Sequence, residues 1–313
     1  MGPVTMRCPL RNLARSSEDA VRVAPGGTIR SMPIDNEWSG SMLEIYEHFL
    51  VPALFTPYAA HLAQRAAAEA PATVLEVAAG TGALTRALVA ALPGARVTAT
   101  DFNPAMVSWS AQRLPEANWQ VADALDLPVP DASVDLIACQ FGVMFVPDKI
   151  AAFTEAARVL APQGALLCST WGPVESSPFP AALVAALVAA LAEVLPVDPP
   201  DFIARIPHGY ADPAQVADDL RAAGLLPSIE PTVLRGRAPS AAALAMGFCQ
   251  GTPLRFALQA RGDLAELTAA VAAAMTARLG EGPVDGDLAG LVITGRPDRE
   301  RQRAGTDLRP RRG

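Results

Sequence analysis

The chain has 313 residues, which is enough for one large domain or two small ones with a sizeable core. A formal net charge of −7 argues against a general nucleic-acid binder, because phosphate contacts need clustered Lys and Arg side chains. The four cysteines form no CxxC pair and the three histidines have no ligand spacing. We therefore expect no disulfide framework, no metal site and a cytoplasmic location.

The N-terminal segment 1–32 carries scattered arginines without the apolar stretch of a signal peptide, and we expect it to be a disordered extension. The segment 36–70 predicts two helices that Pro52 and Pro57 separate, because proline has no N–H to continue a helical hydrogen-bond series.

From residue 72 onward, short apolar segments alternate with stretches of helical spacing. Strands are predicted at 73–78, 95–100, 117–121, 134–140 and 164–171, and helices at 82–92, 104–113 and 149–161. Leu84, Leu88 and Leu92 give the first of these helices an apolar stripe. This alternation is typical of a parallel sheet with helices on both faces, so the fold class is α/β, doubly wound.

The pattern changes after Trp171. Helices are predicted at 180–194, 212–225, 239–248 and 263–279, and strands at 227–235 and 288–296. The apolar run at 179–196 is too short and too rich in alanine for a membrane span, so we expect a buried or lid helix there. The charged tail 297–313 has no hydrophobic pattern and is expected to be disordered.

Ligands of open parallel sheets bind beyond the carboxyl ends of the strands. The first strand ends in Glu76-Val-Ala-Ala-Gly80-Thr81-Gly82, where glycines permit a tight turn and the following helix presents free N–H groups to an anion. A pyrophosphate and a carboxylate would both satisfy this loop. An ordinary strand–helix turn is the alternative, because GxG alone is a weak signal.

Polar residues also follow the next strands. Asp101, 21 positions after Gly80, can accept hydrogen bonds from both ribose hydroxyls, because Asn103 before a proline is the better N-cap for the next helix. Asp123 can accept from an exocyclic amine such as that of adenine, although a solvated loop aspartate explains it equally well. Gln140 and Phe141 follow the fourth strand, nearest the expected switch point of the sheet.

A dinucleotide-binding dehydrogenase is a rival interpretation. Its fingerprint GxGxxG, aligned on Gly80, places Thr85 where glycine or alanine belongs. Aligned on Ala78, the fingerprint loses its first glycine. NAD is therefore the disfavoured cofactor.

Taken together, these motifs resemble the class I S-adenosylmethionine-dependent methyltransferases, and more closely their small-molecule branch, which includes ubiquinone and menaquinone methyltransferases. "VLEVAAGTG" resembles the family's [VL]-L-[DE]-x-G-x-G-x-G, "ATDFNPAMV" its second-strand motif, and "ARVLAPQGALL" its R-V-L-x-P-G-G segment. Two positions depart from the pattern: Ala78 and Gln163 each replace a glycine. Alanine fits at position 78 if its φ angle stays negative.

The resemblance implies a Rossmann-like, seven-stranded sheet, mostly parallel with an antiparallel last strand, with N-terminal lid helices and a helical insertion after the fifth strand. The expected methyltransferase domain is 33–296. Its parts are a cofactor-binding core at 37–172, helical substrate and lid insertions at 173–287, and a closing strand at 288–296.

The resemblance also implies S-adenosylmethionine as the cofactor. Gly80 and Gly82 are then expected at its methionine end, with Glu76 ordering the loop. Asp101 is expected at the ribose and Asp123 at the adenine amine. The other expected cofactor contacts are Tyr46, Ala78, Thr81, Phe102, Met106, Ala124, Gln140 and Phe141.

The implied function is methyl transfer to an O, N or C atom of a hydrophobic small molecule by in-line displacement, without nucleic acid or a membrane span. His61 is the candidate base for a phenol or enol acceptor, with His48 and His208 as alternatives. The acceptor pocket is expected from 36–62 and from the insertion. The lid residues Trp38, Tyr46 and Tyr58 are expected near cofactor or substrate. Phe179, Phe202, Met246 and Phe248 are expected at the pocket, with the core of a helical subdomain as the equally favoured alternative. An inactive cofactor-binding scaffold or regulator is the alternative, and the edge of the sheet can support a homodimer.

Overall fold

The computed structural model describes residues 22–23, 40–191 and 201–298. Its strands form one sheet in the order β1-β4-β3-β2-β5-β6-β8-β7. The strands are β1 (Arg22–Val23), β2 (Thr73–Val77), β3 (Arg96–Asp101), β4 (Asn118–Val121), β5 (Val134–Gln140), β6 (Leu160–Trp171), β7 (Leu225–Ala238) and β8 (Val284–Pro297). The order reverses between β2 and β5, which makes the carboxyl ends of these two strands the switch point.

The predicted mixed sheet is confirmed. β1 to β6 pair in parallel, β8 pairs antiparallel with β6, and β7 pairs antiparallel with β8. The two-residue strand β1 is an addition to the seven predicted strands. It pairs with β4 at Gln120 and Val121, where the edge of the sheet offers unpaired backbone groups. The rest of segment 1–32, and the tail beyond Asp298, lie outside the described residues.

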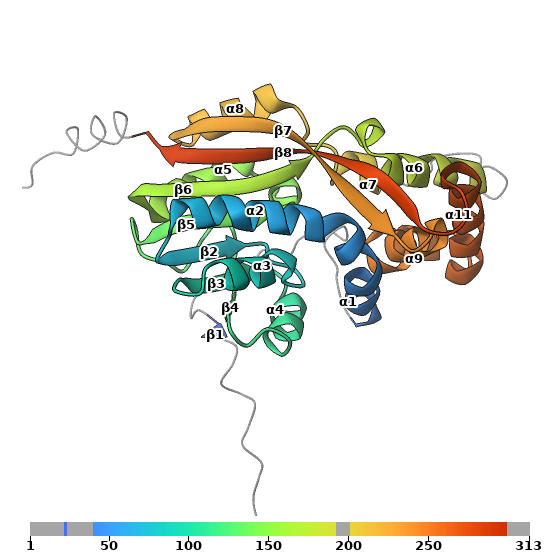
Figure 1. The fold of residues 1–313 in the computed structure, drawn as a ribbon, viewed down its shortest axis with the longest axis horizontal. Helices are drawn as coiled ribbons and strands as arrows, with labels where there is room; N and C mark the ends of the chain where they lie inside the picture. The colour runs from blue at the N-terminus through green and yellow to red at the C-terminus, as the bar shows by residue number, and fades with distance from the viewer. Residues whose placement is uncertain (1–21, 24–39, 192–200, 299–313) are drawn as a thin grey trace, which may run out of the picture.

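Helices cover both faces of the sheet (Figure 1). α2 (Thr56–Glu69) and α3 (Ala83–Ala91) pack together on one face, and α5 (Lys149–Val159) packs with α8 (Pro213–Ala222) on the other. The helix α4 (Pro104–Ala111) packs on β3 and β4. Leu84 and Leu88 of α3 are buried, as the apolar stripe predicts. The expected N-cap is also present, because the Asn103 side chain accepts from the Ala105 N–H.

The predicted break between two N-terminal helices is wrong. α1 (Ser41–Ile45), the π-helical segment η2 (Tyr46–Phe55) and α2 follow one another as one continuous helical run. Pro52 lies inside the π-helical segment, where hydrogen bonds to the fifth residue back replace the α-helical pattern that its missing N–H interrupts. Pro57 lies in the first turn of α2, where its N–H is not needed.

A helical cluster lies beyond one end of the sheet, and the long strands β7 and β8 extend into it (Figure 1). It contains α6 (Pro178–Leu191), α7 (Phe202–Arg205), α9 (Ala241–Gly251), α10 (Leu254–Gln259) and α11 (Leu264–Leu279). α9 packs against α1, η2 and α11, so this cluster meets the N-terminal helices. The stretch 173–287 therefore holds strand β7 as well as the expected helices. Of the helices in the described residues, none has the length and apolarity that a membrane crossing requires.

Strand β7 forms one edge of the sheet. It carries Pro227 and Pro231, which pair in register with Gly295 and Leu291 of β8. Proline cannot donate a backbone hydrogen bond, so these residues limit the addition of a further strand at this edge.

Candidate cofactor and acceptor site

The glycine-rich loop between β2 and α3 is held by backbone hydrogen bonds. The Ala79 N–H donates to the Thr100 carbonyl of β3 at 2.9 Å, and the Gly82 N–H donates to the Ala79 carbonyl at 2.9 Å. The Ser110 hydroxyl of α4 donates to the Gly80 carbonyl at 2.9 Å. The loop is thus fixed to two neighbouring elements before any ligand binds.

The backbone of Ala78 is left-handed, which contradicts the negative φ angle expected from the sequence. Its φ angle is +56°, in the left-handed region, whereas the expectation was a negative φ. Gly80 and Gly82 in the same loop have φ angles of +55° and +81°. A left-handed alanine costs about 1–2 kcal/mol relative to the right-handed region. The turn therefore has the shape of a glycine turn, with strain at the position where glycine is replaced.

Asp101 ends β3 and contacts the same loop. Its Oδ2 accepts from the Gly80 N–H and its Oδ1 accepts from the Asn103 N–H, each at 2.9 Å. Burial raises the pKa of Asp101, and these two N–H groups oppose that shift. Each carboxylate oxygen has a second lone pair, so Asp101 can hold the loop and still accept from a ligand. The sequence predicts a ligand contact for Asp101 but not its hydrogen bond to the loop.

Glu76 lies beneath the loop with 1% of its surface exposed. Its Oε2 accepts from the Thr85 hydroxyl at 2.6 Å, which joins β2 to the first turn of α3. Burial raises the pKa of Glu76 to about 8, with the Asp101 charge acting in the same direction and Thr85 and Arg86 opposing it. Glu76 is therefore mostly protonated at neutral pH and supports the loop as a neutral group.

Gln140, at the end of β5, connects the sheet to the N-terminal helices. Its Nε2 donates to the Phe55 carbonyl at 2.8 Å. Its Oε1 is buried and has no hydrogen-bond partner in the part of the chain that the structure describes. A buried amide oxygen without a partner is costly, so this atom is suited to accept from a bound ligand.

The next residue, Phe141, has a φ angle of +53°. Its ring stacks on Trp171 at the end of β6, with 3.6 Å between ring centroids and 7° between planes. Tyr58 of α2 meets both rings edge-on, and its hydroxyl lies 2.8 Å from the Thr232 carbonyl and 3.0 Å from the Leu288 carbonyl. Left-handed backbone in a bulky residue is uncommon and tends to occur at functional sites.

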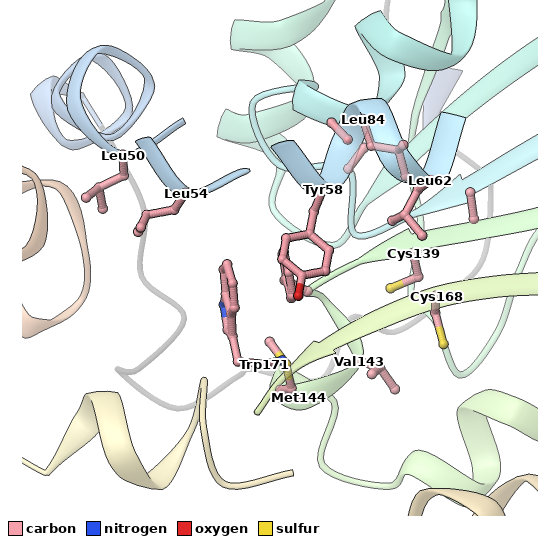
Figure 2. Packing of buried hydrophobic residues seen from close by; sticks show 14 of the residues in the cluster. Leu50, Leu54, Tyr58, Leu62, Leu84, Cys139, Val143, Met144, Cys168 and Trp171 are labelled. Carbon is pink, nitrogen blue, oxygen red and sulfur yellow. The ribbon is translucent and has the colours of Figure 1, made fainter. Parts of the chain in front are cut away.

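Figure 2 shows Tyr58 and Trp171 side by side, with Leu50 and Leu54 approaching from the N-terminal helices. Leu54 and Trp171 both line the cavity described next, whereas Tyr58 is fully buried behind it. The aromatic cluster of Phe55, Tyr58, Phe141 and Trp171 therefore joins the N-terminal helices to the switch point.

One cavity of about 490 Å³ joins these features. Residues expected at the cofactor that line it are Tyr46, Glu76, Ala78, Gly80, Thr81, Asp101, Phe102, Met106, Asp123, Ala124, Gln140 and Phe141. Gly82 does not line it and instead lies against the Trp119 ring. Of the residues expected in the acceptor pocket from the insertion, Phe202 and Phe248 line the cavity. Phe179, which is fully buried, and Met246 do not line it. Trp38 lies outside the described residues.

His61, the candidate base of the sequence interpretation, is not among the residues that line the cavity. It is half-buried near Glu230 of β7, and its Nε2 is buried without a hydrogen-bond partner among the described residues. His48 is exposed and contacts Phe49. The histidine that lines the cavity is His208, which follows α7.

The ionisable groups that line the cavity are acidic apart from His208 and Tyr46. Asp101, Asp123 and Asp148 belong to its wall together with Glu76, which is mostly neutral, and no described lysine or arginine does. The opposite wall is apolar and comes from η2, α7, α9 and β8. Its residues include Leu50, Leu54, Phe55, Ile203, Phe248 and Leu288. Such a cavity favours a ligand with positive charge at the sheet and an apolar group at the helices.

In comparisons with known proteins, the matching family model and the similar curated proteins are all methyltransferases. A model described as "Methyltransferase domain" matches residues 75–168. Malonyl-[acyl-carrier protein] O-methyltransferase of Hahella chejuensis is 39% identical over 102 residues, covering 32% of this chain and 37% of that protein. Demethylmenaquinone methyltransferase of Deinococcus radiodurans is 31% identical over 176 residues, covering 52% of this chain and 71% of that protein.

The chain belongs to the S-adenosylmethionine-dependent methyltransferases. In two of the other methyltransferases that resemble it, the matched segment spans 37% and 52% of the relative's length. A solved structure, of a putative sarcosine dimethylglycine methyltransferase from Galdieria sulphuraria, is 16% identical with a TM-score of 0.49, covering 83% of this chain and 99% of that one.

The cavity of this methyltransferase suits the family's cofactor, which carries a sulfonium and an ammonium group. The unpartnered Gln140 Oε1 can accept from an ammonium, and the acidic wall favours a cation. No atom lies within 4 Å of the place where a Cβ on Gly80 would stand, so the loop leaves open space on its cavity side. Sequence patterns did not identify Trp171, Leu54 or Leu288 as part of the cavity, because their positions depend on how the helical cluster docks.

Proposed function

We propose that this protein transfers a methyl group from S-adenosylmethionine to a neutral, hydrophobic small molecule. The observation that carries the proposal is the continuous cavity, with an acidic cofactor wall at the strand ends and an apolar wall at the helices. When bound, the cofactor would supply an electrophilic methyl group. The protein's own task would be to align the acceptor and exclude water.

The proposed role of each cofactor residue follows from its position. Asp101 and Asp123 would hold the ribose and the adenine amine, and the loop at Gly80 would receive the methionine end. Gln140 would accept from the methionine ammonium through its unpartnered oxygen. Tyr46, whose pKa burial raises well above its usual value, would close the site from η2 as a neutral hydroxyl.

The charge of the cavity narrows the acceptor class. An acid such as a malonyl group needs a cation beside its carboxylate, and none of the described lysines or arginines lines this cavity. A quinone-type acceptor such as the one named in demethylmenaquinone methyltransferase needs only an apolar pocket. We therefore infer a neutral acceptor rather than a carboxylate.

A matched pair of acceptors tests this proposal. The protein is incubated with S-adenosylmethionine labelled in its methyl group, and with 2-naphthol or 2-naphthoate, which share the same ring system. We expect transfer to the neutral acceptor to exceed transfer to the carboxylate at least about tenfold, because a buried unpaired carboxylate is costly. Faster transfer to the carboxylate would contradict the proposed acceptor class. Cofactor binding without transfer to any acceptor would favour the inactive scaffold.

The proposal includes a location in the cytoplasm, a reducing compartment. The free and buried thiols of Cys139, Cys168 and Cys249 support this location. It also includes a possible homodimer, which light scattering of the purified protein would test. Pro227 and Pro231 on β7 make edge-to-edge pairing an unfavourable route to such a dimer.

A further inference from the structure

His208 is fixed in one tautomer at the cavity wall. The residue is 9% exposed, and its Nδ1 lies 2.7 Å from the Gly172 carbonyl oxygen. A carbonyl oxygen can only accept a hydrogen bond, so Nδ1 carries the ring proton and Nε2 carries a lone pair. The Gly172 N–H in turn donates to the Ala289 carbonyl of β8 at 2.9 Å, which holds this carbonyl in place.

A series of ring contacts connects His208 to the switch point of the sheet. The His208 ring lies 6.1 Å from the Trp171 ring at an angle of 29°, and the Trp171 ring in turn stacks on the ring of Phe141. Phe141, Trp171 and His208 all line the cavity. The rings of Phe141 and Trp171 thus connect His208 to the carboxyl end of β5, within the same cavity.

The surroundings keep His208 neutral. Burial lowers the pKa of its imidazole, and the Gly172 hydrogen bond and the charge of Glu175 oppose this shift. Nearby, the Tyr210 hydroxyl is occupied because it donates to Asp219 at 2.6 Å. A histidine that is neutral at physiological pH, with a lone pair on Nε2, is able to accept a proton.

Other polar side chains at this wall are engaged elsewhere. The Thr252 hydroxyl donates to the Phe248 carbonyl at 2.7 Å, and the Ser177 hydroxyl accepts from the Ala289 N–H at 2.9 Å. Asp148, which also lines the cavity, caps α5 by accepting from the Ala151 N–H. Among the described residues of the apolar wall, His208 is the group suited to proton transfer.

We propose that His208 is the general base for a hydroxyl acceptor, so that the substrate class is a hydrophobic phenol or enol and the product an O-methyl ether. The proposal rests on the proposed methyltransferase function. The acceptor O–H bond breaks and its proton moves to Nε2 of His208. An oxygen lone pair forms the bond to the methyl carbon, and the bond from that carbon to sulfur breaks with its electron pair remaining on sulfur.

The test uses the full chain, with His208→Gln as the variant and His61→Gln as the matched control outside the cavity. The rate of labelled methyl transfer to 2-naphthol is measured against pH, and the affinity for S-adenosylmethionine is measured by calorimetry. We expect His208→Gln to lose about 100-fold or more of the rate at neutral pH, as the loss of a general base requires. Its remaining rate should rise with pH as the phenol itself ionises, while cofactor affinity and the His61→Gln variant stay at the wild-type level.

A second measurement does not depend on activity or on the variant folding. Nitrogen-15 NMR of the wild-type histidine rings should show His208 neutral at neutral pH, with its proton on Nδ1. A proton on Nε2, or a charged ring, would overturn the proposal. Parallel pH profiles for the wild type and His208→Gln would also overturn it. So would transfer to amine or carbon acceptors without any transfer to phenols, which leaves the proposed function standing. Absence of cofactor binding would instead overturn the proposed function.

Discussion

The methyl group of Ala78 occupies the space in which a side chain on Gly142 would lie. A Cβ built on Gly142 would overlap with the Cβ of Ala78, and it would also come within 2.9 Å of the Cys139 sulfur. Ala78 adds a methyl group to the loop after β2, and Gly142, which faces it after β5, has no side chain. The two positions therefore complement each other across the switch point.

This complementarity predicts how substitutions at the two positions combine. Ala78→Gly should stabilise the protein by about 1 kcal/mol, because relief of the left-handed alanine exceeds the added flexibility of glycine. Its affinity for S-adenosylmethionine should change little, since the loop keeps its shape. Gly142→Ala should destabilise the protein, and less so when Ala78→Gly is also present. Urea unfolding of the four proteins measures this double-mutant cycle, and strictly additive effects would contradict the contact.

Gly80 and Gly82 should respond differently to the same substitution. Both have positive φ angles, so alanine at either position should cost about 1–2 kcal/mol of stability. A Cβ on Gly82 would lie 3.1 Å from the Trp119 ring, whereas a Cβ on Gly80 would enter open space at the cavity. Gly80→Ala should therefore weaken S-adenosylmethionine binding more than Gly82→Ala, although it destabilises the fold less. Calorimetry and urea unfolding of both variants check this, and equal affinities would contradict the loop's place at the cofactor.

Glu76 gives stability a defined dependence on pH. Its folded-state pKa of about 8 lies above the ordinary value of 4.5, so the folded protein holds a proton that the unfolded chain releases. Its contribution to the free energy of unfolding is therefore full below pH 4.5 and is lost between pH 4.5 and 8, by up to about 1.4 kcal/mol per pH unit.

The variant Glu76→Gln carries a neutral amide in place of the protonated acid, so it should lack this part of the pH dependence. The quantity to measure is its free energy of unfolding relative to the wild type, by urea unfolding between pH 5 and 8. The exposed Glu44→Gln serves as the control and should follow the wild type. If the Glu76→Gln difference stays constant over this range, Glu76 is ionised in the folded protein.

The Gln140 amide should hold the N-terminal helices over the site. Gln140→Leu removes the donor to the Phe55 carbonyl, a neutral hydrogen bond worth about 0.5–1.5 kcal/mol. Amide hydrogen exchange in 46–56 should become faster by about the corresponding factor, roughly 2- to 10-fold. The exposed Gln112→Leu is the matched control. Unchanged exchange in this segment would show that other contacts hold the helices.

The sequence predicted the part of the site that chain topology determines. Each of these residues lies at or just after the carboxyl end of a strand whose period could be recognised: Glu76, Gly80, Asp101, Asp123 and Gln140. Parallel strands bring their carboxyl ends to one edge of the sheet. Motif and topology together therefore placed these residues around one cavity without any knowledge of side-chain packing.

The part that sequence could not predict depends on docking and on local backbone conformation. His208 follows a four-residue helix in the insertion, and only the packing of that segment against Trp171 brings it to the cavity. His61 shares α2 with Tyr58 but does not line the cavity, which helix prediction alone could not show. The positive φ of Ala78 comes from bonds to β3, and residue type alone favours the opposite sign.

The most direct test of the central claim is calorimetric titration with S-adenosylmethionine of the wild type and of Asp101→Ala. The wild type should bind S-adenosylmethionine and not NAD. Asp101→Ala should bind at least about 10-fold more weakly, because it loses both the ribose acceptor and the hydrogen bond to Gly80. Equal affinity in the two proteins would contradict the assigned ribose site. Binding of NAD without S-adenosylmethionine would contradict the account as a whole.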